Sequence, residues 1–336
     1  MRNFFKILFG FVLAGLFLSI VLSIILSIFG AKDTQVDGFF VIKRGDNVFQ
    51  IAGNLKQQGY ISNQLAFVYS ATVSENFRKM KAGRYQIQQG QTYEELIENF
   101  VKDQYSPIEI SIPPGKTIKD IAIILSSNRL FKKEEFLNSA LNPSQDILNK
   151  FPFLSDLPKD AGLEGYLFPD NYSIDLSQSV EDVESQILSN FDKKLTQDLR
   201  DEIKKRNRTI FQAVTMASIL EKEIRTYKDR QIVSGILWKR IDNHLPLQVD
   251  SSFLYFQTST HPDVLEKDVD SRYNTYKYVG LPRGPISNPD LDSIKAAIYP
   301  KNTDYWFYLS APNGETIFAK TLGQQLINKA KYLTNN

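Results

Sequence analysis

The chain has 336 residues, of which 42% are hydrophobic and 23% are charged, as is ordinary for a globular protein. At roughly 100–200 residues per domain, this length predicts two domains besides the N-terminal segment. The 40 basic and 38 acidic side chains give a net charge of +2, which argues against nucleic acid as a partner, because nucleic-acid binding usually requires a concentrated basic patch. The absence of cysteine excludes disulfides, thiolate zinc sites and thiol nucleophiles.

The first predicted element is an uncharged, apolar run from Ile7 to Phe29. A bilayer core about 30 Å thick needs about 20 such residues in a helix, so residues 7–29 are expected to span a membrane. Arg2 and Lys6 precede the run. Because positive charge tends to stay on the cytoplasmic side, residues 1–6 are placed in the cytoplasm and the rest of the chain outside it. The alternative is a cleaved signal peptide, which would have a shorter apolar region and a small residue in place of Phe29.

Three stretches after this run share one pattern. An apolar residue stands three positions before a glycine, Asn or Thr follows two positions after it, and apolar residues fall three, six and ten positions after it. This pattern predicts a short strand, a tight turn at the glycine, a helix N-cap and an amphipathic helix. The stretches are residues 42–55, 87–100 and 112–125, with turns at Gly45, Gly90 and Gly115 and caps at Asn47, Thr92 and Thr117. Such units resemble LysM modules, which bind glycans that contain N-acetylglucosamine, although they could equally be scaffolding.

The segment from Thr209 to Arg230 begins apolar on nearly every side, which is typical of a buried helix, and then carries Glu221 and Glu223. Glu223 is expected to lie over the apolar residues one turn earlier, where burial raises the pKa of a carboxyl group. A carboxylic acid kept protonated near neutral pH can act as a general acid. Glu221 has a simpler interpretation, because Arg225 follows four residues later in the order that favours an exposed ion pair. Alternatively, both glutamates only mark where the helix emerges into water.

Polar groups follow in two later stretches. Gln248, Asp250 and Ser251 interrupt an apolar stretch, which suits either hydrogen-bonding groups presented to a cleft or a helix N-cap. Residues 273–289 contain three tyrosines, two glycines and three prolines, which predicts a loop without regular hydrogen bonding. Its aromatic faces and the amide of Asn274 suit sugar rings and N-acetyl groups, although a rigid surface loop would also explain the prolines.

The remaining elements predict an α+β fold. Glu164, in the stretch Gly-Leu-Glu-Gly-Tyr, either lines the same cleft or satisfies a turn. Residues 177–207 are charged with a helical period and are interpreted as a solvated helix. A strand pair is predicted around the turn at Asn313 and Gly314, and residues 320–333 are expected to close the domain as a helix.

The stretch from Ala217 to Glu223, Ala-Ser-Ile-Leu-Glu-Lys-Glu, resembles the signature of the MltG, or YceG-like, endolytic murein transglycosylases. Further segments match this family in the same order. They are Leu163–Asp170, Leu247–Ser251, Tyr273–Tyr276, Gly280–Pro282, Pro285–Pro289 and Ser293–Ala297. Together with the N-terminal run and the LysM-like region, the resemblance covers the chain from about residue 5 to about residue 325.

The resemblance implies a role for each candidate residue. The catalytic acid would be Glu223, with Glu221 as the alternative. Where the family often has Thr after this glutamate, this chain has Ile224. The residues expected to bind substrate are Gln248, Asp250, Ser251, Asn274, Thr275, Tyr276 and Glu164, and no metal or cofactor is implied.

The reaction implied is cleavage of the MurNAc-GlcNAc β-1,4 bond of nascent peptidoglycan. In the family the C6 hydroxyl of the sugar is the nucleophile, so one carboxyl suffices, and the 1,6-anhydroMurNAc ends formed terminate strand elongation near the peptidoglycan synthases. The first alternative is a non-catalytic peptidoglycan-binding scaffold of the synthesis machinery. The second is a muramidase hydrolase that uses Asp250 or Glu164 as the second carboxylate.

The expected organisation is a single-pass protein of the bacterial cytoplasmic membrane with its catalytic domain outside the cytoplasm. After the cytoplasmic residues 1–6 and the anchor at 7–29, a small LysM-like α+β domain is predicted at residues 38–105. A larger α+β catalytic domain, with the buried glutamate-bearing helix, is predicted at residues 106–336.

Overall fold

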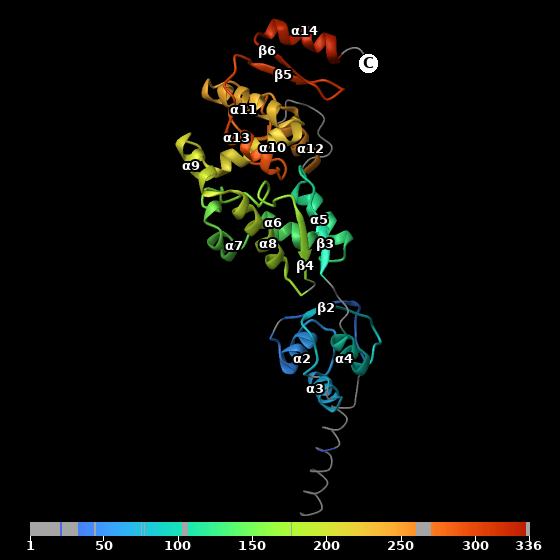
Figure 1. The fold of residues 1–336 in the computed structure, drawn as a ribbon. Helices are drawn as coiled ribbons and strands as arrows, with labels where there is room; N and C mark the ends of the chain where they lie inside the picture. Colours follow the sequence, from blue (N-terminus) through green and yellow to red (C-terminus); the bar gives the residue numbers. More distant parts are fainter. Residues whose placement is uncertain are drawn as a thin grey trace, which may run out of the picture. The chain divides into compact units, whose positions relative to one another are not determined.

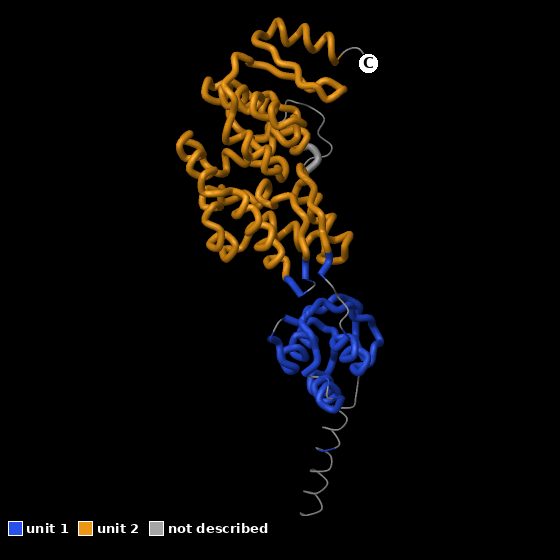
Figure 2. The backbone as a smooth tube through the Cα atoms, viewed as in Figure 1, with its two compact units in different colours: residues 1–108, 174–178 blue, residues 109–173, 179–336 orange. Residues whose placement is uncertain are grey.

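The computed structural model describes Val21 and residues 33–43, 45–74, 76, 78–102, 107–175, 177–259 and 270–333. Apart from Val21, the predicted membrane span at residues 7–29 lies outside the described residues. Within them, no helix is both long enough and apolar enough to cross a membrane. The chain divides into two compact units, which are residues 1–108 with 174–178 and residues 109–173 with 179–336 (Figure 2).

Unit 1 combines a small antiparallel sheet with helices (Figure 1). Its elements in chain order are β1 (Gly38–Ile42), α2 (Val48–Gln57), α3 (Gln64–Val73), β2 (Gly83–Ile87) and α4 (Tyr93–Val101). β1 pairs with β2 so that Gly38 lies opposite Ile87 and Ile42 lies opposite Gly83. Apolar residues of the strands and helices form one core, in which Phe100 of α4 lies 5.9 Å from Phe40 of β1 and 6.4 Å from Phe67 of α3, between ring centroids.

The three predicted strand, turn and helix stretches are confirmed. The third consists of β3 (Ile108–Ser111) and α5 (Ile118–Ser127) and belongs mainly to unit 2. Each turn contains a glycine with positive φ, namely Gly45, Gly90 and Gly115. Each helix begins with a capping box, in which the capping residues are Asn47, Thr92 and Thr117. The pattern persists because glycine supplies the left-handed turn and the cap satisfies N–H groups of the first helical turn.

Unit 2 is mainly helical. Its further helices are α6 (Lys133–Leu141), α7 (Gln145–Lys150), α8 (Val180–Lys194), α9 (Gln197–Lys205), α10 (Ile210–Glu223), α11 (Tyr227–Asp242), α12 (Asp250–Ser259) and α13 (Leu291–Ile298), with a short 3-10 helix at Pro152–Leu154. β3 pairs with β4 (Asn171–Ile174). Helix α10 is central, because it contacts α9, α11, α12 and α13.

The helical period predicted at residues 177–207 is confirmed, but the interpretation of the segment as one solvated helix is wrong. The segment forms α8 and α9, and Val183, Ile187 and Phe191 of α8 are fully buried. Phe191 lies 5.1 Å from Phe153 and 5.3 Å from Tyr166, between ring centroids. Most of the charged residues that dominate the composition lie on the outer face, with Glu184 as a buried exception, so composition concealed an amphipathic pattern.

The predicted C-terminal hairpin is confirmed. β5 (Phe307–Ser310) pairs antiparallel with β6 (Thr316–Ala319), and Gly314 in the connecting turn has a φ of 84°. Helix α14 (Leu322–Leu333) follows and contacts both strands. With its helices and small two-stranded sheets, the described part of the chain has the predicted mixed α+β fold.

Candidate functional site

The site is built on the C-terminal end of α10. Thr209 caps the start of this helix by accepting the N–H of Gln212, and every residue from Ala213 to Leu220 is buried. A helix that is apolar all round must lie inside the protein. The helix ends at Glu223, and the next residue, Ile224, has an extended conformation. The polar end of this buried helix therefore lies at the surface of unit 2.

Glu223 lies against the start of α12. Its Oε1 accepts the main-chain N–H of Ser251, the second residue of α12, at 3.3 Å. Burial raises the pKa of Glu223, and the negative charge of Asp250 raises it further, while the interactions with Ser251 lower it. A helix N-terminus also favours a carboxylate anion. The net shift is upward, so Glu223 stays protonated to a higher pH than an exposed glutamate, and its anion still has a donor beside it.

A cavity of about 450 Å³ opens beside this carboxyl group. Its walls are the end of α10, the segment that follows it and the β5–β6 hairpin. The lining residues are Glu221, Lys222, Glu223, Ile224, Arg225, Arg230, Ser310, Ala311, Gly314 and Thr316. Ser310 also donates its hydroxyl to the main-chain oxygen of Glu223 at 3.1 Å. The predicted catalytic residue therefore lines a cavity.

The charge of Glu223 acts on Tyr276 and Tyr308, and the charge of Arg240 acts on the same two tyrosines. The hydroxyl of Tyr276 donates to Oδ1 of Asp250 at 2.7 Å. Burial raises the pKa of Tyr308, and the charge of Glu223 raises it further, whereas the charge of Arg240 lowers it. Arg240 is buried, and its Nη1 donates to the main-chain oxygen of Leu247 at 2.8 Å. These charges therefore act on one another across α10, α11, α12 and β5.

Tyr308 and Arg240 were not predicted from the sequence as site residues. Tyr308 lies in an aromatic run that indicates only a strand. Arg240 lies in a helix without a recognisable motif. Alternate residues of a strand face the same side. Tyr308 and Ser310 of β5 are therefore expected on one side of the strand, which is the one sequence signal for Tyr308.

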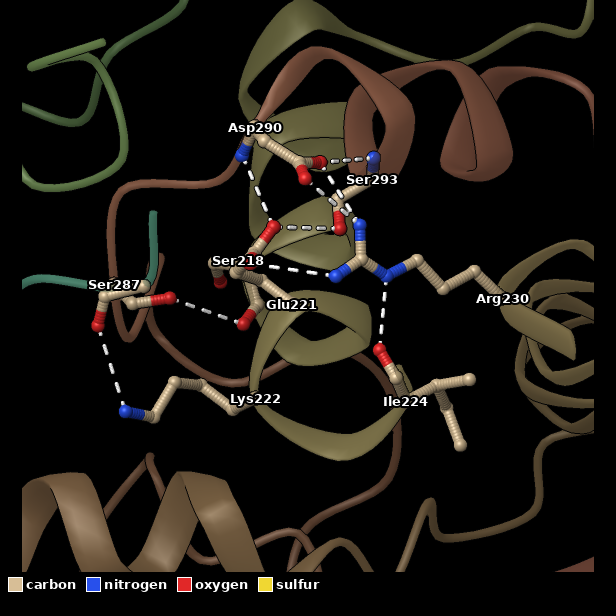
Figure 3. A network of polar contacts seen from close by, with 9 residues as sticks. Ser218, Glu221, Lys222, Ile224, Arg230, Ser287, Asp290 and Ser293 are labelled. Atoms are coloured by element: carbon tan, nitrogen blue, oxygen red, sulfur yellow. Dashed lines mark hydrogen bonds and ion pairs between the residues drawn. The ribbon is translucent and has the colours of Figure 1, made fainter. Parts of the chain in front are cut away.

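Glu221 occupies a different environment from the predicted one (Figure 3). Its Oε2 accepts the Ser293 hydroxyl at 2.8 Å and the Asp290 N–H at 3.0 Å, and its Oε1 lies 3.4 Å from Nη2 of Arg230. The side chain is only 7% exposed. The predicted exposed pair with Arg225 is wrong, because α10 ends at Glu223 and the helical spacing of four residues no longer applies.

Arg230 joins this network to the end of α10 (Figure 3). Its Nη1 donates to both carboxylate oxygens of Asp290, at 2.9 and 3.0 Å, and its Nε donates to the main-chain oxygen of Ile224 at 2.9 Å. Burial raises the pKa of Glu221, and the charge of Arg230 opposes that shift. The network fixes where α10 ends relative to α11 and α13. Because Glu223 follows Glu221 by two residues, the network also fixes the position of Glu223.

Glu164 is buried among protein donors. Its oxygens accept the Ile118 N–H at 3.2 Å, the Tyr255 hydroxyl at 3.0 Å and an Asn288 amide N–H at 3.0 Å. Burial raises its pKa to about 8, and the donors from Ile118 and Tyr255 oppose that shift. Glu164 does not line the cavity beside Glu223. This arrangement favours the structural one of the two interpretations offered for Glu164.

Of the other residues predicted to bind substrate, some are buried and some are exposed. Asn274 and Thr275 are buried, and Thr275 Oγ1 accepts the Val249 N–H at 2.9 Å. Gln248 is exposed with a φ of 58°, and its N–H donates to the Thr275 main-chain oxygen at 3.0 Å. The two segments are thus bonded to each other, and Thr275 holds the start of α12 in place through Gln248, Val249 and Ser252. Gln248 and Asp250 are the exposed members of the predicted substrate-binding set.

A second cavity, of about 430 Å³, lies elsewhere in unit 2. Its lining includes Arg208, Trp238 and Lys239. The guanidinium of Arg208 lies over the Trp238 ring at 4.2 Å, and Lys239 Nζ donates to the Thr303 main-chain oxygen at 2.9 Å. Arg208 and Lys239 thus already have partners within the protein, and none of the predicted site residues lines this cavity.

Comparison with known proteins gives consistent matches over most of the chain. A model of the YceG-like family matches residues 40–331. The endolytic murein transglycosylase of Bacillus subtilis (strain 168) is 29% identical over 317 residues, which cover 90% of this chain and 87% of that protein. The protein of the same name from Streptococcus pneumoniae (strain D39) is 32% identical over 321 residues, and the match covers 88% of this chain but only 58% of that protein.

A solved structure agrees with these matches. The crystal structure of a YceG-like protein from Listeria monocytogenes superimposes with a TM-score of 0.60 and 26% sequence identity. The superposition covers 88% of this chain and 99% of that one.

Proposed function

This chain belongs to the YceG-like family, and on that premise we propose that it is an endolytic lytic transglycosylase of peptidoglycan. The bond cut would be the β-1,4 bond between MurNAc and GlcNAc. The single observation that carries the proposal is Glu223, a carboxyl group of raised pKa that lines a cavity and accepts the N–H of Ser251. Curated relatives that carry the name endolytic murein transglycosylase support the same assignment.

In the proposed reaction, protonated Glu223 gives its proton to the glycosidic oxygen as the bond from C1 of MurNAc breaks and oxocarbenium character develops. The Ser251 N–H, at the start of α12, stabilises the carboxylate that remains. The C6 hydroxyl of the same MurNAc then bonds to C1, and its proton passes to Glu223. The products are a GlcNAc with a free C4 hydroxyl and a 1,6-anhydroMurNAc end, and no water is consumed.

A second candidate is a muramidase hydrolase, which needs a second carboxylate to activate water or to act as nucleophile. Asp250 favours this candidate, because it is exposed at the start of α12 and its charge raises the pKa of Glu223. Its bond from the Tyr276 hydroxyl stabilises the ionised form that such a role requires. The two reactions differ in whether the new end retains an oxygen from water.

We propose the remaining roles on sequence grounds. Residues 7–29 would anchor the chain in the cytoplasmic membrane, supported by the uncharged run after Arg2 and Lys6. Unit 1 would be LysM-like, supported by its order of strand, two helices and strand. The enzyme would then act on nascent strands outside the cytoplasm and terminate their elongation close to the peptidoglycan synthases.

The test compares the full-length chain with single variants on uncrosslinked glycan strands. Loss of a general acid typically costs roughly 10²- to 10⁴-fold in rate, so Glu223→Gln is expected to lose activity by that factor while it remains folded. Glu134→Gln, at an exposed position on α6, is the matched control and should be unchanged. The assignment fails if Glu223→Gln cuts as fast as the wild type. A wild type that binds strands without cutting them would favour the non-catalytic scaffold.

A further inference from the structure

The cavity beside Glu223 has a positively charged wall. Lys222, on the last turn of α10, and Arg225, two residues beyond its end, both line the cavity and are both exposed. Among the described residues, neither side chain forms an ion pair with a carboxylate. Lys222 Nζ makes one long hydrogen bond, of 3.4 Å, to the main-chain oxygen of Gly115. Two cations are thus available where substrate would enter.

A cation at a helix C-terminus often has a simpler purpose, because it stabilises the negative end of the helix dipole. At the end of α10 that purpose is served by Arg230, whose Nε donates to the Ile224 main-chain oxygen at 2.9 Å and which is paired with Asp290. Within the described residues, Arg225 donates to no carbonyl of α10. Its guanidinium lies instead against the turn of the β5–β6 hairpin, where any side chain at Gly314 would overlap it.

The substrate of the proposed reaction supplies a matching negative charge. The C3 oxygen of MurNAc carries a lactyl group, which in an uncrosslinked strand is extended by a peptide with free carboxylates. C3 is two ring carbons from C1, where the bond is cut. The peptide is therefore attached to the same sugar ring whose bond Glu223 is proposed to cut. The cavity that Glu223 lines is therefore close to the ring that carries the peptide. Its volume of about 450 Å³ falls within the range of small-ligand sites.

We propose that this cavity is a subsite for the peptide of the MurNAc whose bond is cut, with Arg225 binding a peptide carboxylate and Lys222 adding a second positive charge. A planar guanidinium matches a carboxylate through two parallel hydrogen bonds. The subsite makes the enzyme selective for strands that still carry their peptides. This inference rests on the proposed transglycosylase function.

The experiment uses the full-length chain and two substrates, which are uncrosslinked strands with their peptides and the same strands after an amidase has removed the peptides. A hydrogen bond to a charged group contributes about 1.5–3 kcal/mol. Arg225→Gln is therefore expected to lower kcat/KM by about tenfold or more on peptide-bearing strands and to leave the value for stripped strands unchanged. Arg225→Lys keeps the charge but loses the bidentate geometry. Its kcat/KM on peptide-bearing strands should therefore fall between those of the wild type and Arg225→Gln.

The matched control is Lys228→Gln. Lys228 is exposed in the first turn of α11 and does not line the cavity, so this variant removes the same charge close by without touching the subsite. Its kcat/KM should be unchanged on both substrates. The subsite is refuted if the wild type cuts both substrates equally well, or if Arg225→Gln loses equally on both, as a purely structural contact with the hairpin would require. A wild type that cuts neither substrate refutes the proposed function itself.

Discussion

Glu223 is held between two influences on its protonation. Burial and the charge of Asp250 raise its pKa, whereas Ser251, at the start of α12, lowers it. A group that must first give a proton and then take one back needs both influences, because a strongly shifted pKa in either direction would hinder one of the two steps. This balance is how a single carboxyl can serve both steps of the proposed reaction.

The charge of Asp250 gives a test of this balance. Asp250→Asn removes a negative charge that raises the pKa of Glu223, so that pKa should fall. The proposed acid works only when protonated, and activity is therefore lost as pH rises through its pKa. We expect the alkaline limb of kcat/KM against pH to move to lower pH in Asp250→Asn. An upward shift would contradict this electrostatic role, and loss of activity at every pH would assign Asp250 as the second carboxylate of a hydrolase.

At the scale of elements, the end of α10 is fixed by contacts from distant parts of unit 2. Gly115, in the third strand, turn and helix stretch, donates its N–H to the Asn288 main-chain oxygen at 2.8 Å and accepts from Lys222. Arg230 of α11 and Asp290, which precedes α13, hold the other side. The third stretch of the repeated pattern therefore supports the glutamate-bearing helix, and the buried network of Arg230 completes that support.

Removal of Arg230 should be costly for this reason. Arg230→Met leaves Glu221 and Asp290 without their shared cation, and breaking a buried ion pair on one side costs about 3–5 kcal/mol. The matched control is Arg206→Met, which breaks the partly exposed pair of Arg206 with Glu202 and should cost less than about 1 kcal/mol. Urea unfolding of both variants measures the difference. Equal losses of stability would contradict a buried, supporting network.

Local elements were predictable from the sequence because their causes are local. A glycine that supplies a left-handed turn and a Thr or Asn that caps the next helix lie within three residues of each other, and all three such stretches form as predicted. The Asn313 and Gly314 turn of the C-terminal hairpin is of the same kind.

The surroundings of the glutamates were not predictable, because they depend on contacts between distant segments. Ser293 reaches Glu221 across 72 residues, and Asn288 reaches Glu164 across 124 residues. The interpretation of Glu221 was wrong for a related reason. Its spacing to Arg225 assumed that the helix continued, and only the position of Arg230 and Asp290 determines where it ends.

On the scale of the whole molecule, two buried carboxyl groups couple the stability of unit 2 to pH. Burial raises the pKa of Glu164 to about 8 and that of Glu184 to about 7, both from 4.5. Each folded-state pKa lies above the unfolded value, so the folded state binds more protons in this range. The stabilisation is complete below pH 4.5 and is lost as pH rises through about 7 and about 8.

Glu164→Gln tests this coupling, because glutamine keeps the shape of the side chain but does not titrate. The free energy of unfolding of the variant should fall less steeply than that of the wild type as pH rises from 4.5 to about 8. Denaturant unfolding at several pH values measures the slope. Glu134→Gln, at an exposed position on α6, should keep the wild-type slope. Parallel curves for wild type and Glu164→Gln would contradict a buried, protonated Glu164.

The most direct test of the central claim is the source of the oxygen at the new end. Full-length enzyme would cleave uncrosslinked glycan strands in water enriched in heavy oxygen, and mass spectrometry would read the products. The account predicts anhydro ends that lack one water and carry no heavy oxygen, because the C6 hydroxyl of MurNAc is the nucleophile. Reducing ends that contain heavy oxygen would contradict it and identify water as the nucleophile.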